Sequence, residues 1–106
     1  MSNTWRRFEV LFPLQFNDGS PVPEEWLSEA VREIVDHFGA ANYETQRVEG
    51  LWRHGDVLYR DTLVRLVVDV PDRTKSRRWM KDFKARWKSR LGQLELWMVS
   101  YRVKLE

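Results

Sequence analysis

The fold is decided by residues 8–39, FEVLFPLQFNDGSPVPEEWLSEAVREIVDHFG, where a strand pattern gives way to a helix pattern. In 8–16 every second residue is apolar, which is the period of a half-buried strand. Polar residues, glycine and proline follow at 17–21 and are typical of a turn. In 26–38 the apolar residues recur every three or four positions and form one stripe, and Gly39 then supplies a stop. The stretch therefore predicts a strand followed by an amphipathic helix.

The rest of the chain predicts a hairpin, a second helix and a last strand. Two extended runs in 43–70 flank the sequence Arg-His-Gly-Asp at 53–56, a glycine-containing turn of the kind that closes a hairpin. A second amphipathic pattern follows at 75–91, and alternation returns at 95–105. This β-α-β-β-α-β order predicts a ferredoxin-like α+β fold, with both helices on one face of a four-stranded antiparallel sheet.

The composition is that of one folded domain. The 106 residues are 42% hydrophobic and include six tryptophans, enough to fill a single core, so we expect one domain over 1–106. Cysteine is absent, which excludes disulfides, thiolate metal sites and cysteine nucleophiles. We see no signal-peptide pattern and no apolar run of membrane-spanning length, and therefore expect a cytoplasmic location.

The sheet face that the helices leave bare is the first candidate surface. The alternation of the last strand assigns Trp97, Val99 and Tyr101 to the helix side. The apolar residues assigned to the bare face, with Trp52 added from the hairpin, are Leu11, Leu63, Val67, Leu96 and Met98. A solvated antiparallel face is usually polar, so this set favours a surface that is buried against something else. A second copy of the chain, forming a homodimer, is the favoured partner, and a different protein or an apolar ligand is the alternative. Scattered surface apolar residues would be the plainer explanation.

The second predicted helix is strongly basic. Nine of the eighteen Lys and Arg residues fall in 73–90. The candidates for contact with a nucleic-acid backbone are Arg77, Arg78, Lys81, Lys84 and Lys88. However, the first helix is acidic and can neutralise the second, and the net charge is only +2. A structural role for these charges is therefore the favoured interpretation.

The sequence carries no motif for catalysis. His37 and His54 have no partner at metal-ligand spacing, and no glycine-rich loop offers to hold phosphate, so we predict no metal, cofactor or catalytic residue. We therefore expect a small soluble non-enzymatic interaction or regulatory module that acts as a homodimer through the bare face. A nucleic-acid-binding protein is the alternative, and a small metal-dependent nuclease using Glu9 ranks last.

Overall fold

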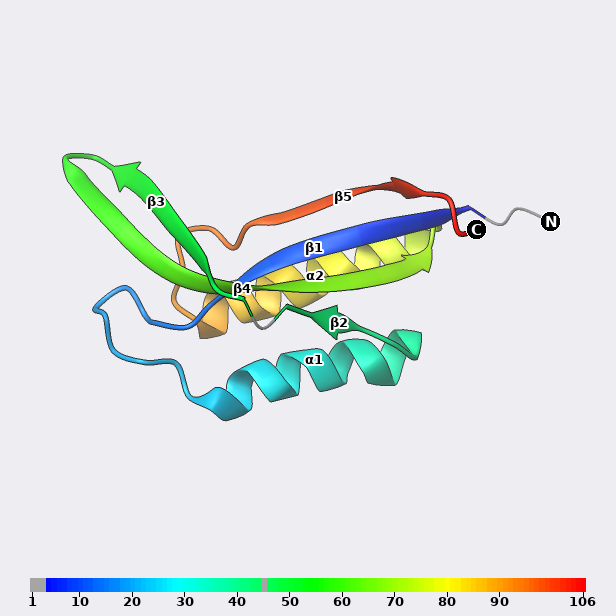
Figure 1. The fold of residues 1–106 in the computed structure, drawn as a ribbon, viewed down its shortest axis with the longest axis horizontal. Coiled ribbons are helices and arrows are strands. Elements are labelled where there is room, and N and C mark those ends of the chain that lie inside the picture. Colours follow the sequence, from blue (N-terminus) through cyan, green and yellow to red (C-terminus); the bar gives the residue numbers. More distant parts are fainter. Residues whose placement is uncertain (1–3, 45) are drawn as a thin grey trace.

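The computed structural model describes residues 4–44 and 46–106, which form an α+β fold (Figure 1). The elements in chain order are β1 (Trp5–Pro13), α1 (Glu24–Phe38), β2 (Asn42–Tyr43), β3 (Val48–His54), β4 (Val57–Pro71), α2 (Thr74–Arg90) and β5 (Met98–Val103). The strands pair in the order β2-β4-β1-β5, and β3 also pairs with β4. Neither of the two helices is long and apolar enough to cross a membrane, among the residues described.

The sheet has five strands where the sequence predicted four. The predicted second strand is divided into β2 and β3, and both pair antiparallel with β4. β2 lies opposite Leu66 and Val67, whereas β3 lies opposite residues 57–63. The Glu44 N–H, just after β2, still donates to the Arg65 carbonyl at 3.0 Å. The prediction of a single second strand was therefore wrong, because alternation does not reveal where a ladder is interrupted.

The core lies between the helices and one face of the sheet. Phe8, Val10 and Phe12 of β1 are buried on this face, because side chains alternate across a strand. The residues of β4 and α2 that are buried in the same core are Val64, Leu66, Val68, Val70, Met80, Phe83 and Trp87. β1 ends at Pro13, which has no N–H to continue the ladder. Both helices cover the same face, so the other face is left open.

The predicted facing of the last strand was wrong. β5 pairs with β1 so that Met98 lies opposite Val10, and paired residues point to the same side of a sheet. Met98 therefore packs against the core, and Leu96, just before the strand, is only 1% exposed. Trp97 and Tyr101, which were assigned to the helix side, are exposed instead. On β5, the odd-numbered residues, such as Val99 and Tyr101, therefore line the open face.

A hairpin arm extends from one end of the sheet. β1 pairs only with residues 63–71 of β4, so residues 57–62 have β3 as their one strand neighbour. We call β3 with residues 57–62 the hairpin arm; it projects past the other strands at the upper left of Figure 1. Leu51, Val57 and Leu58 of this arm are exposed large apolar side chains. The arm forms one wall of the site described next.

Candidate functional site

A pocket of about 270 Å³ opens on the uncovered face of the sheet, at the base of the hairpin arm. Three segments enclose it: the end of β1, the arm, and the segment that joins α2 to β5. Its lining residues are Leu11, Pro13, Gly50, Leu51, Trp52, Asp61, Leu63, Gln93, Glu95, Leu96 and Trp97. The lining is mostly apolar, with a few polar groups, which is the usual make-up of a small-molecule site.

Strand register brings these residues together. Pro13 of β1 lies opposite Leu63 of β4, and the Leu11 N–H donates to the Trp97 carbonyl at 3.0 Å, which fixes the third segment beside β1. Gly50 keeps the pocket open, because a Cβ at this position would lie 3.1 Å from Leu63 Cδ1. Any larger residue at position 50 would have to displace the Leu63 side chain.

Trp52 is held rigidly in the pocket wall. Its ring stacks on Tyr59 with centroids 4.4 Å apart, and its Nε1–H donates to Asp61 Oδ2 at 2.6 Å. These contacts fix both ring angles before any ligand arrives. A pre-positioned indole offers a flat apolar surface at little cost in side-chain entropy.

Carboxylates supply the polar side of the pocket. Asp61 lies on the arm, and Glu95 lies across from it on the segment before β5. Lys84 Nζ lies 3.0 Å from Glu95 Oε1, and this hydrogen bond, aided by the Leu96 N–H, holds the pKa of Glu95 below its usual range. Glu95 is therefore ionised at neutral pH, as one member of an ion pair with Lys84.

A row of polar side chains continues along the open face beyond the pocket. Glu9 is two residues from Leu11 on β1, a separation of about 7 Å along a strand. Glu9 accepts a hydrogen bond from the Tyr101 hydroxyl, and its Oε1 lies 3.4 Å from Arg65 Nε. This hydrogen bond raises the pKa of Tyr101, because the phenol proton is donated to the carboxylate. We call Glu9, Arg65 and Tyr101 the polar row.

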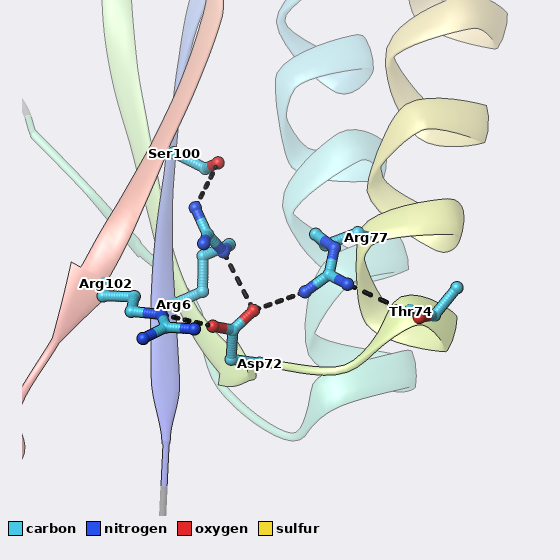
Figure 2. Close-up of polar contacts among 6 residues, drawn as sticks. All are labelled: Arg6, Asp72, Thr74, Arg77, Ser100 and Arg102. Carbon is cyan, nitrogen blue, oxygen red and sulfur yellow. Dashed lines mark hydrogen bonds and ion pairs between the residues drawn. The ribbon is translucent and has the colours of Figure 1, made fainter.

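A second charged cluster lies at the other end of the sheet, on the helix side (Figure 2). The Asp72 side chain is 4% exposed and binds Arg6 at 2.9 Å, Arg77 at 2.6 Å and Arg102 at 3.2 Å. Arg6 also donates to the Ser100 hydroxyl at 3.1 Å. The cluster joins β1, α2 and β5 to the turn between β4 and α2, so its position indicates a structural role.

The structure separates the predicted interface residues into two groups. Leu11, Leu63 and Val67 lie on the open face, and Trp52 lies in the arm; all but Val67 line the pocket. Leu96 and Met98 point to the helix side, as described above, although Leu96 also reaches one edge of the pocket. The expected contiguous patch is therefore smaller at β5 than the sequence suggested.

The basic residues of α2 are partly engaged by carboxylates. Arg77 binds Asp72 and Lys84 binds Glu95, whereas Arg78 and Lys81 are exposed and Lys88 is half-buried. Between the helices, Arg86 binds Glu33 at 3.3 Å, and Arg90 binds Glu29. The acidic first helix thus pairs with the basic second one. Within the described ranges, no group of three acidic or histidine side chains is placed to hold a metal ion.

Comparison with known proteins finds a likeness among solved structures. No protein-family model matches the sequence, and no curated protein matches it significantly. Among solved structures, the fold is similar to that of a phage SAM lyase in complex with S-methyl-5′-thioadenosine, with a TM-score of 0.64 and 11% sequence identity. The match covers 96% of this chain and 89% of the lyase chain. At this identity the likeness establishes the fold alone.

This likeness overturns the expected function. The sequence predicted a non-enzymatic interaction module, yet a solved structure that matches nearly the whole chain is an enzyme. The prediction was wrong because it relied on the lack of a recognisable catalytic motif. A site assembled from three distant segments leaves no such motif in the sequence.

Proposed function

We propose that this protein binds an adenosyl sulfur compound in the open-face pocket and cleaves S-adenosylmethionine to release S-methyl-5′-thioadenosine. The observation that carries the proposal is the pocket itself, in which a fixed indole faces carboxylates at the base of the arm. The fold likeness to a lyase bound to S-methyl-5′-thioadenosine supports the choice of ligand. The strand order also supports the ferredoxin-like class for the chain.

The chemistry of the pocket suits both parts of such a ligand. The adenine ring is flat and apolar on its faces, so it can stack on Trp52 or Trp97. The positive sulfonium is attracted by aromatic faces and by the carboxylate of Asp61, whereas the charge of Glu95 is offset by Lys84. A neutral thioether lacks this attraction, so the site is suited to bind the charged substrate more tightly than the product.

The proposed reaction is a simple cleavage. The bond between the sulfonium sulfur and the aminobutyrate chain breaks, and the sulfur keeps the electron pair as a neutral thioether. The substrate's own carboxylate can close on the carbon that the sulfur leaves, so atoms and charge balance without a further reactant. The protein's part is to hold the reacting atoms in line and to exclude water.

Purified protein is expected to convert S-adenosylmethionine to S-methyl-5′-thioadenosine faster than buffer alone, as measured by liquid chromatography with mass spectrometry. Trp52→Ala is expected to weaken S-methyl-5′-thioadenosine binding by about ten-fold or more in calorimetry, because the stacking surface is lost. Leu58→Ala is the matched control, since Leu58 is an exposed residue of the same arm outside the pocket. If wild-type protein neither binds the thioether nor exceeds the buffer rate, the proposal is wrong.

We further propose a homodimer through the open face, so that the second copy would face the polar row and border the pocket. Trp97 and Tyr101 add exposed aromatic surface to the half-buried Val67 on this face. Unpartnered apolar surface of this kind is typical of an interface. A cytoplasmic location also stays a proposal.

Light scattering is expected to give about twice the 12.8 kDa chain mass for wild-type protein and the single mass for a Val67→Glu, Val99→Glu double variant. Two buried carboxylates per copy would oppose association. Met98, which the sequence had placed on this face, is unsuitable for the test because it packs against the core. A wild-type protein of single mass at high concentration would reject the dimer.

A further inference from the structure

We propose that Arg65 and Glu9 form a subsite for an α-amino-acid group beside the pocket, so that the protein selects adenosyl ligands that carry an amino-acid chain. The inference rests on the proposed function, because it takes the adenosyl part to occupy the pocket. It goes further by naming the residues that would distinguish S-adenosylmethionine from its product.

Arg65 has an unused hydrogen-bond donor. Among the described residues, its Nε is buried and makes no hydrogen bond, although the side chain as a whole is 34% exposed. The nearest carboxylate oxygens are Glu9 Oε1 at 3.4 Å from Nε and Glu44 Oε1 at 3.8 Å from Nη1, and neither makes a hydrogen bond to Arg65. A buried donor without a partner is costly, whereas guanidinium binds a carboxylate strongly through two parallel hydrogen bonds. A ligand carboxylate would reach Arg65 through the exposed part of its side chain, because Nε itself has almost no exposed surface.

The local charges fit the other half of an amino acid. One guanidinium, on Arg65, lies between two carboxylates, on Glu9 and Glu44, so the group carries excess negative charge. Glu9 is held in place by the Tyr101 hydroxyl, and its side chain is 16% exposed. Because an ammonium group is attracted to this excess charge, the zwitterion of an amino acid meets a complementary arrangement.

The subsite lies where the amino-acid chain would extend. Arg65 is the direct strand partner of Leu11 and follows Leu63 by two residues, and both leucines line the pocket. All three side chains are on the open face. The sulfur of S-adenosylmethionine is separated from its α-carbon by two methylenes, so a ligand with its sulfur at the pocket edge can place the amino-acid group against Arg65. The row is thus an extension of the pocket along one sheet face.

The test compares two stable ligands by calorimetry. S-adenosylhomocysteine has the amino-acid chain and lacks the sulfonium, whereas S-methyl-5′-thioadenosine lacks the chain. Wild-type protein is expected to bind S-adenosylhomocysteine about ten-fold more tightly. Arg65→Met, which keeps an apolar stem, and Glu9→Gln are each expected to remove about ten-fold of that affinity and to leave thioadenosine binding within about two-fold. Arg60→Met is the control, because Arg60 is an exposed arginine on the other face of β4.

The outcomes separate the subsite from the function. The subsite is wrong if Arg65→Met and Glu9→Gln lose affinity equally for both ligands, or lose none for either. In that case, binding of S-methyl-5′-thioadenosine by wild-type protein would still support the pocket. The subsite is also wrong if wild-type protein binds S-adenosylhomocysteine no more tightly than S-methyl-5′-thioadenosine. Binding of neither ligand to wild type would reject the proposed function and the subsite together. If Arg65→Met does not fold, as judged by circular dichroism, Glu9→Gln alone decides between these results.

Discussion

Trp87→Ala is expected to lower the free energy of unfolding by about 3–5 kcal/mol, the range for removing a large aromatic side chain from a core. Trp87 is 1% exposed, and its ring meets the edge of Phe12 at a centroid distance of 5.4 Å. Its Nε1–H also donates to Glu33 Oε2 at 2.9 Å, which joins α2 to α1. The substitution therefore leaves a cavity and removes one of the hydrogen bonds to Glu33, which keeps its ion pair with Arg86. Urea denaturation followed by circular dichroism measures the loss.

Trp97→Ala is the matched control for this experiment. Trp97 is 45% exposed on the open face, so its removal is expected to cost about 1 kcal/mol or less. The same substitution is expected to weaken thioadenosine binding, because Trp97 lines the pocket. Similar destabilisation by the two substitutions would contradict the distinction between a core tryptophan and a site tryptophan.

The order and type of the main elements could be predicted because each has a strong local period. The alternation that begins at Phe8 and the apolar stripe that ends at Phe38 correspond to β1 and α1. On β4, the line of apolar residues that includes Val64 and Val70 is buried as its period indicates. Local periodicity suffices when one line of a strand is clearly more apolar than the other.

The facing of β5 could not be predicted because both of its lines carry apolar residues. Trp97, Val99 and Tyr101 form one line, and Leu96 and Met98 belong to the other. The choice is made by hydrogen-bond register with β1, where Met98 lies opposite Val10. A shift of one residue exchanges the two faces completely. The sequence prediction chose the longer aromatic line and was wrong.

The candidate site was hidden for a related reason. The sequence predicted that Leu11, Leu63 and Trp52 belong to the surface on which the pocket lies. However, the pocket also depends on the length of the arm and on the path of residues 93–97. Neither property has a local signal. Glu9 and Arg65 were visible as charged residues on the bare face, yet only the pairing of β1 with β4 brings them together. A charged pair beside an apolar face is the signal that could have suggested them.

Asp72→Asn is expected to lower the melting temperature at neutral pH by several degrees, because one nearly buried carboxylate neutralises three arginines (Figure 2). Without its charge, Arg6, Arg77 and Arg102 would repel one another at the junction of the sheet and α2. The hydrogen bond from Arg6 is the main cause that holds the pKa of Asp72 below its ordinary value of 3.8, with a smaller contribution from Arg77. Thermal unfolding monitored by circular dichroism measures the effect.

The stabilisation by Asp72 is expected to depend on pH in a definite direction. A carboxylate whose pKa is lowered by folding stabilises the folded state at every pH above its unfolded pKa, and this stabilisation is lost as the pH falls through the folded value. The melting temperatures of wild type and Asp72→Asn should therefore differ most at neutral pH and converge below about pH 4. Asp56→Asn, in the exposed turn of the arm, should follow the wild-type curve. A constant difference between wild type and Asp72→Asn down to the most acidic pH would mean that the carboxylate acts through its shape and hydrogen bonds, with no contribution from its charge.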